Sequence, residues 1–267
     1  MFWAGRDPLL TVREIKGLGV RCGQLAIPGD LPLEHEATLW KTALEAERFT
    51  LVTVFCTFTG ESYADIPTVE RTVGFIPAAT RAEREARTLE ISDFANEIGV
   101  KSIACHVGFI PDDVTHPDYM AVRDLVRRVC ERAERNGQTF ALETGQEPAE
   151  NLLHFLHDAD CQNLRINFDP ANLILYGTGE PLPALELLAP FIESVHAKDG
   201  DWPPKDQPNA LGVEKPLGQG AVNIPAYVAK LKEIGFTGPL NVEREVEDPR
   251  QKLAEMKMGV DLLDSLG

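Results

Sequence analysis

The sequence lacks paired cysteines and long apolar runs. Its five cysteines are scattered singly, with no C-x-x-C spacing, which argues against a disulfide framework and against a zinc–thiolate site. No run of about 18 apolar residues occurs, so we expect no membrane span. The N-terminal MFWAGRDPLL has no basic segment followed by an apolar one, so we expect no signal peptide. These absences are typical of a cytoplasmic protein with free thiols.

Basic residues are also scarce. The chain has 26 Lys and Arg against 42 Asp and Glu, which gives a formal net charge of −16. Proteins that bind nucleic acids need positive charge to neutralise phosphates. We therefore expect neither a nucleic acid nor a membrane surface as a partner, and instead a small-molecule ligand.

Short apolar runs rich in β-branched residues alternate with segments of helical periodicity along the whole chain. The runs are short enough for buried strands, and several helical segments end at a glycine, a common helix terminator. The predicted strands are FWAG near residue 3 and residues 22–27, 51–56, 102–107, 139–143, 164–169, 194–199 and 240–243. The predicted helices cover residues 8–19, 33–49, 81–99, 119–137, 149–160, 182–192, 224–235 and 248–266.

This alternation predicts a (β/α)8 barrel of the TIM type, built as a single domain over residues 1–267. A doubly wound open sheet is the competing architecture. It usually has a glycine-rich turn after its first strand, and FWAGRDP is not such a turn. The Pro/Gly-rich segment 202–220 falls between the seventh strand and its helix, so we expect a loop on the active face.

Acidic residues and one histidine stand at the carboxyl ends of the later strands. In a barrel these ends converge on one mouth, where the chemistry takes place. Each residue also has an ordinary structural explanation. Asp169, which precedes a proline, is a good helix N-cap, and His196 could be a buried core histidine. The four residues at successive strand ends are Glu143, Asp169, His196 and Glu243.

Three carboxylates at one centre would repel one another and would be costly to bury. A divalent cation removes this problem. Oxygen ligands with one imidazole favour Mn²⁺, with Mg²⁺, Co²⁺ and Zn²⁺ as alternatives. The sequence therefore predicts a metal site formed by Glu143, Asp169, His196 and Glu243.

Five stretches resemble a known family. They are ALETG (141–145), NFDPANL (167–173), VHAKD (195–199), the long block PLGQGAVNIPAYVAKLKEIGFTGPLNVERE (216–245) and, more weakly, ACHVG (104–108). The chain resembles the xylose-isomerase-like TIM-barrel superfamily, the sugar phosphate isomerase/epimerase group. Most of these stretches lie in the second half of the chain, and the first half is similar in architecture rather than in motif.

The resemblance implies roles for these residues. Glu143, Asp169, His196 and Glu243 become metal ligands. In the ketose epimerase branch the two glutamates, here Glu143 and Glu243, are also the acid/base pair that moves a proton next to the substrate carbonyl through an enediolate. Many relatives have a histidine where this chain has Asn172. Asn172 could still bind a sugar hydroxyl, but the difference argues against a simple transfer of epimerase specificity.

Further residues are expected near the mouth. Lys198 and Asp199 follow His196 and could contact the substrate or support the ligands, although a loop ion pair would explain them equally well. His106, at the end of the fourth strand, could contact the substrate or have a buried structural role. Trp202 could stack on a sugar ring.

The expected function is that of a divalent-metal-dependent sugar isomerase or epimerase. A lyase or hydratase, or a C-glycoside deglycosidase subunit that acts on a 3-keto sugar, would begin with the same proton abstraction and is the first alternative. A non-catalytic sugar-binding paralogue is the second. An apurinic-site endonuclease shares the barrel but uses more histidine ligands, and the charge of −16 argues against it. We also expect a homo-oligomer, with a small accessory subunit in the deglycosidase case.

Overall fold

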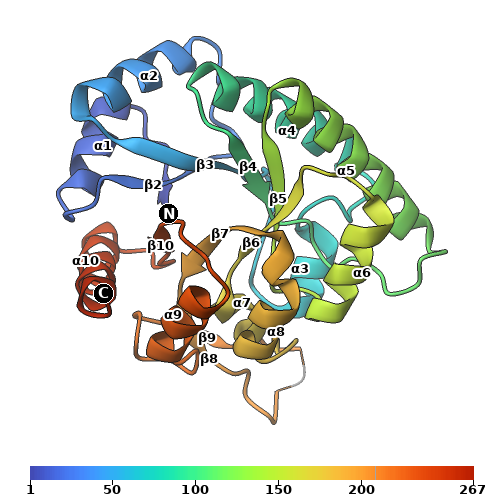
Figure 1. Cartoon of the computed structure of the whole chain (residues 1–267). Coiled ribbons are helices and arrows are strands. Elements are labelled where there is room, and N and C mark those ends of the chain that lie inside the picture. The colour runs from blue at the N-terminus through green and yellow to red at the C-terminus, as the bar shows by residue number, and fades with distance from the viewer. Residues whose placement is uncertain (208) are drawn as a thin grey trace.

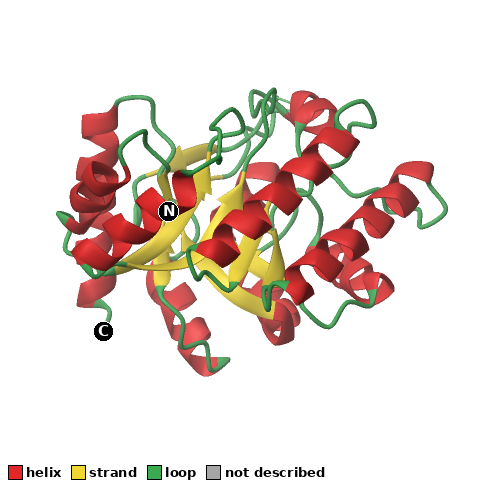
Figure 2. Ribbon diagram, turned by 90° about the horizontal axis from the view of Figure 1, so that it is seen from above, coloured by secondary structure: helices red, strands yellow, loops and turns green. Residues whose placement is uncertain are grey.

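The computed structural model describes residues 1–207 and 209–267. A curled sheet of eight parallel strands forms its centre, in the order β1-β2-β3-β4-β5-β6-β7-β10, and helices surround it (Figures 1 and 2). The predicted (β/α)8 fold and its single domain are confirmed. The strands of the sheet are β1 (Phe2–Trp3), β2 (Cys22–Ile27), β3 (Thr50–Cys56), β4 (Ser102–Cys105), β5 (Thr139–Glu143), β6 (Leu164–Phe168), β7 (Ile192–Ala197) and β10 (Leu240–Val242).

A helix matches each of the eight predicted helical segments. They are α1 (Pro8–Lys16), α2 (Glu36–Glu47), α4 (Arg81–Glu97), α5 (Pro117–Arg135), α6 (Ala149–Ala159), α8 (Pro181–Leu188) with the 3₁₀ turn η1 (Ala189–Phe191), α9 (Ile224–Glu233) and α10 (Pro249–Ser265). Within the described ranges, none of the helices is long and apolar enough to cross a membrane.

Four elements were not predicted as separate units. Helices α3 (Ile66–Thr72) and α7 (Pro170–Tyr176) have seven residues each, too few to show helical periodicity. The predicted loop 202–220 contains a strand, β9 (Val213–Lys215), which pairs antiparallel with β8 (Asp199–Asp201). Residue 208, inside this loop, lies outside the described residues.

Between β1 and β10, the two edges of the curled sheet, no strand pairing occurs among the described residues. There the Met1 amino group donates a hydrogen bond to the Val242 carbonyl oxygen, and Figure 1 places the N-terminus beside β10. Elsewhere each strand pairs in parallel with its neighbour, so all the carboxyl ends point to the same mouth.

The described core has three parts. The largest cluster lies between the strands and the helices. A small cluster combines Phe55 with three alanines, Ala26, Ala104 and Ala141, one residue from each of β2 to β5, and another joins Val69, Val73 and Tyr176. The Phe55 ring lies 5.7 Å, centroid to centroid, from the ring of His196 in β7, so the small inner cluster packs directly against the ends of the later strands.

Candidate metal centre and active site

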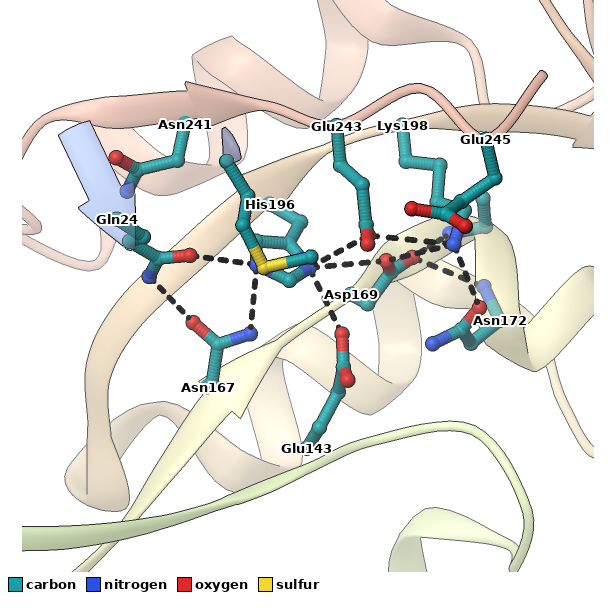
Figure 3. Close-up of polar contacts among 12 residues, drawn as sticks. Gln24, Glu143, Asn167, Asp169, Asn172, His196, Lys198, Asn241, Glu243 and Glu245 are labelled. Carbon is teal, nitrogen blue, oxygen red and sulfur yellow. Dashed lines mark hydrogen bonds and ion pairs between the residues drawn. The ribbon is translucent and has the colours of Figure 1, made fainter. Parts of the chain in front are cut away.

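The four predicted ligands converge at the mouth of the barrel. Glu143 ends β5, Asp169 follows β6, His196 lies in β7 and Glu243 follows β10. All four are buried, and one potential ligand atom from each lies within 4.8 Å of the others. The Nδ1 atom of His196 lies 2.8 Å from Glu143 Oε1, 2.9 Å from Glu243 Oε2 and 3.2 Å from Asp169 Oδ2 (Figure 3). Four strand ends that are distant in sequence thus place three carboxylates around one imidazole nitrogen.

Asp169 caps a helix and also faces the centre of the site. Its Oδ1 accepts hydrogen bonds from the backbone N–H groups of Ala171 and Asn172, and so caps helix α7. Its Oδ2 faces His196 Nδ1. Capping therefore fixes the carboxylate and leaves its second oxygen at the centre of the site, where it could bind a metal ion.

A polar network behind His196 selects which ring nitrogen faces the carboxylates. Gln24 Oε1 lies 2.6 Å from His196 Nε2, while Gln24 Nε2 donates to Asn167 Oδ1 at 2.9 Å. Asn167 Oδ1 also accepts from the Ser194 hydroxyl group. Asn167 Nδ2 also lies 3.2 Å from His196 Nε2. The shorter contact, with the Gln24 carbonyl oxygen, favours the ring proton on Nε2. Nδ1 is then free to bind a metal ion.

Sequence reasoning missed Gln24. It lies in the middle of β2, in the run CGQLAI, and is fully buried. A buried amide between apolar strand residues needs a polar partner. That requirement was the available signal, but it does not identify a partner 172 residues away.

The electrostatics of the cluster require compensating positive charge. Burial would lower the pKa of His196, but Glu243 and Glu143 outweigh it and raise that pKa well above its usual value. Burial would raise the pKa of Glu243, but Lys198 and His196 lower it well below its usual value. Burial dominates at Asp169, whose pKa is raised. The carboxylates are therefore stabilised here by protons on neighbouring groups, and a divalent cation would supply the same compensation.

Glu143 provides the test of whether a metal ion fits. Its Oε2 lies 2.6 Å from His106 Nε2 and its Oε1 lies 2.8 Å from His196 Nδ1, yet neither oxygen has a hydrogen-bond partner of good geometry among the described residues. A buried carboxylate rarely remains unsatisfied in this way. Oxygen atoms of three carboxylates and one imidazole nitrogen form a donor set suited to a divalent metal. The residues present fit such an ion.

Lys198 and Asn172, both predicted to bind substrate, lie together beside the cluster. The Lys198 ammonium group is 3.2 Å from Glu243 Oε2 and 3.8 Å from Asp169 Oδ2, and it donates to Asn172 Oδ1 at 3.4 Å. Burial would lower the pKa of Lys198, but Glu243 and Asp169 outweigh it and raise that pKa well above its usual value. Lys198 therefore stays charged next to Glu243.

Asp199 was predicted to contact substrate or to support the ligands. Its carboxylate instead faces the loop before helix α9. Oδ1 accepts from the backbone N–H groups of Gly200 and Val222, and Oδ2 accepts from those of Gly218 and Gly220. Each oxygen has two donors, so the side chain anchors this loop. Contact of Asp199 with a substrate remains a prediction.

A cavity of about 370 Å³ opens above the cluster. Glu243, His106, Asn172 and Lys198, all predicted site residues, contribute to its wall. Sequence reasoning missed the rest of the wall, which comes largely from loops. The most prominent of the missed residues are Trp3, Phe55, Glu61, Tyr63, Glu214 and Glu245. Trp202, considered as a stacking residue, is 40% exposed and is not part of this wall.

Comparisons with known proteins agree with this fold. The family model described as xylose isomerase-like TIM barrel matches residues 12–266. A solved xylose isomerase domain protein from Planctomyces limnophilus is 41% identical, with a TM-score of 0.91 over 96% of this chain and 91% of that one. An uncharacterised protein from Methanocaldococcus jannaschii is 26% identical over 57% of this chain, and the match spans about half (53%) of that relative.

Two more distant structures share the fold. A xylose isomerase-like TIM-barrel protein from Mycobacterium smegmatis, in complex with magnesium, is 18% identical, with a TM-score of 0.71 and coverage of 97% of this chain and 87% of that one. D-Psicose 3-epimerase from Clostridium cellulolyticum H10, solved with D-tagatose, is 16% identical, with a TM-score of 0.72 and coverage of 99% and 95%.

Proposed function

The chain belongs to the xylose isomerase-like TIM-barrel family, and from that premise we propose that it is a divalent-metal-dependent sugar isomerase or epimerase. One observation carries the proposal. Three buried carboxylates surround a single imidazole nitrogen, His196 Nδ1, below a cavity that is open to a ligand. Such a cluster is costly unless a cation or a reaction uses it.

In this proposal Glu143, Asp169, His196 and Glu243 hold the metal ion, with Mn²⁺ preferred and Mg²⁺, Co²⁺ or Zn²⁺ as alternatives. When bound, the ion polarises the carbonyl group of a ketose and so makes the neighbouring C–H more acidic. The magnesium complex of one relative and the epimerase activity named for another support this assignment.

The residues of the chain move the proton. Glu243 lines the cavity and would accept or return the proton on one side of the reacting carbon. Lys198, hydrogen-bonded to Glu243 Oε2, holds that carboxylate in place. Glu143, on the other side, would act as the second base, next to His106. Gln146 donates to His106 Nδ1 at 3.0 Å and so orients the His106 ring towards Glu143.

The experiment begins with metal content. Elemental analysis of protein purified without chelators should find about one divalent ion per chain in the wild type and in Asp30→Ala, an exposed control, but none in Asp169→Ala. Each protein is then incubated with D-tagatose and D-psicose in deuterated water. We expect metal-dependent deuterium incorporation next to the carbonyl in wild type and control.

The outcomes separate the alternatives. A wild type that takes up neither Mn²⁺ nor Co²⁺ contradicts the proposal. Metal binding without exchange in any ketose favours elimination chemistry on a 3-keto sugar or sugar binding without catalysis. The homo-oligomeric state, the accessory subunit and the cytoplasmic location remain predictions.

A further inference from the structure

The cavity above the cluster has almost no positive charge available to a ligand. Among the described residues of its wall, the basic side chains are those of His106 and Lys198. His106 Nε2 already lies 2.6 Å from Glu143 Oε2. The other basic side chain is that of Lys198. Its ammonium group is already engaged by Glu243, Asp169 and Asn172 at 3.2 to 3.8 Å. A phosphate or carboxylate group of a substrate is usually bound by arginine, lysine or a set of free backbone N–H groups. The side chains of this wall do not offer such a partner.

Carboxylates dominate the same wall. Glu61, Glu214 and Glu245 contribute to it in addition to Glu243. Two of these carboxylates have a basic partner behind the wall: Glu214 is paired with Arg244 at 2.8 Å and Glu245 with Lys252 at 3.6 Å. Glu61 accepts from the backbone N–H groups of Gly74 and Phe58, and burial raises the pKa of its carboxyl group. The described wall still has more acidic than basic side chains, so an anion that entered the cavity would meet a net acidic lining in a region where burial weakens solvent screening.

The backbone N–H groups that most often bind phosphate in (β/α)8 barrels are also occupied. Such sites form in the loops after the seventh and eighth strands. Here the loop after β7 supplies four N–H groups, those of Gly200, Gly218, Gly220 and Val222, and the Asp199 carboxylate accepts from all four at 2.9 to 3.0 Å. These four N–H groups are therefore not available to a substrate phosphate.

The rest of the wall suits an uncharged sugar. The rings of Trp3, Phe55, Tyr63 and Tyr176 face the cavity, and such rings can pack against the C–H groups of a sugar. We propose, building on the proposed function, that the site selects neutral sugars and excludes sugar phosphates and sugar acids. The glutamates of the wall are the specificity determinants. The chain would then act before any phosphorylation or oxidation of its sugar.

The first test measures the charge of the cavity directly and needs no turnover. Trp3 lines the cavity and is 38% exposed, while Trp202 is 40% exposed outside it, and Trp40 is fully buried. The variant Trp202→Phe reports on Trp3, and Trp3→Phe reports on Trp202. For each tryptophan we take the ratio of the fluorescence quenching constant for iodide to that for acrylamide. We expect this ratio to be at least about threefold lower for Trp3 than for Trp202. The double variant Glu61→Gln/Glu245→Gln should raise the ratio for Trp3. Equal ratios for the two tryptophans, unchanged by the double variant, would overturn the proposal.

The second test compares matched ligands on metal-loaded protein. D-Tagatose, D-tagatose 6-phosphate and D-tagaturonate are compared by protection of Trp3 from acrylamide and by deuterium exchange. We expect both anions to be at least about tenfold weaker than the neutral sugar, with a gap that narrows as salt screens the charges. A phosphate or acid that binds as well as the neutral sugar would refute the selectivity even if exchange occurs. If no ketose undergoes deuterium exchange but iodide is still excluded from Trp3, the proposed reaction is refuted and the charge selectivity of the cavity is not.

Discussion

The two halves of the barrel bury very different side chains. In the first half, up to β4 and helix α5, Arg84 is the one charged side chain that is buried among the described residues. The second half, from β5 onward, buries charge at the end of almost every strand. Burial of charge costs several kcal/mol per group unless partners compensate it, so the second half carries a cost that the first avoids. Its buried charged or titratable residues are Glu143, Glu147, Asp169, His196, Lys198, Asp199, Glu243 and Arg244.

The difference means that the two halves of the barrel contribute different kinds of residue to the site. The second half supplies the groups that could hold a metal ion and move a proton. The first half supplies most of the aromatic rings, the amide of Gln24, and the side chains of Glu61 and His106 at the cavity wall. If this division is correct, substitutions in the second half should abolish the reaction, and those in the first half should tune it.

Glu243→Gln should have the largest effect, because it removes both a proposed ligand and a proposed base. We expect proton exchange to fall by about 10⁴-fold or more, which corresponds to about 5.5 kcal/mol in the barrier. The measurement is the rate of deuterium incorporation into a ketose at saturating Mn²⁺.

The control is Glu193→Gln, which makes the same chemical change at an exposed position near the amino end of strand β7, away from the mouth of the barrel. Exchange in this variant should stay within about twofold of the wild type, as is usual for surface substitutions. A Glu243→Gln enzyme with more than a tenth of wild-type activity would show that Glu243 is not the base.

Glu147 tests the cost of buried charge outside the cluster. Its carboxylate is buried, has no hydrogen-bond partner among the described residues, and has a pKa raised by burial from 4.5 to about 8. Below about pH 4.5 both the folded and the unfolded states are protonated. Between pH 4.5 and 8 the unfolded state ionises first, so the wild type progressively loses stability, and the loss levels off above pH 8.

Glu147→Gln removes this dependence. Relative to the wild type, its free energy of unfolding should rise with pH by a total on the order of 4 kcal/mol between pH 4.5 and 9. Urea unfolding of both proteins at pH 5, 7 and 9 measures the difference. A stability difference that is constant with pH would mean that Glu147 is ionised or solvated in the folded state.

The same contrast explains what the sequence could predict. Glu143, Asp169, His196 and Glu243 follow apolar runs, and the parallel arrangement alone brings strand ends to one mouth. Glu61 and Tyr63 lie in the connection after β3, where no periodicity indicates which side chains turn inward. Asp199 stands next to a predicted ligand, but the orientation of its carboxylate depends on N–H groups about 20 residues later in the chain.

Gln24 links the two halves, and its substitution should have an intermediate effect. Gln24→Leu removes the carbonyl oxygen that accepts the His196 Nε2 proton, so the ring is no longer held with Nδ1 towards the carboxylates. Loss of such a supporting hydrogen bond typically weakens metal binding by about 10- to 100-fold. Titration of metal-free protein with Mn²⁺ measures the dissociation constant.

Gln24→Glu restores an acceptor for the same proton and is the matched comparison. It should bind Mn²⁺ more tightly than Gln24→Leu. If Gln24→Leu binds Mn²⁺ as the wild type does, orientation of His196 does not depend on the first half of the barrel.

The two exposed tryptophans give the smallest expected effect and the closest comparison of the halves. Trp3 from the first half lines the cavity, and Trp202 from the second half lies outside its wall, although the two are almost equally exposed. Loss of an aromatic contact with a ligand costs about 1 kcal/mol, or about fivefold in affinity. Trp3→Leu should therefore raise the KM for a neutral ketose about fivefold with little change in kcat, whereas Trp202→Leu should change neither by more than twofold. The opposite order would place the sugar against the loop after β7, and the first half would then supply neither chemistry nor binding.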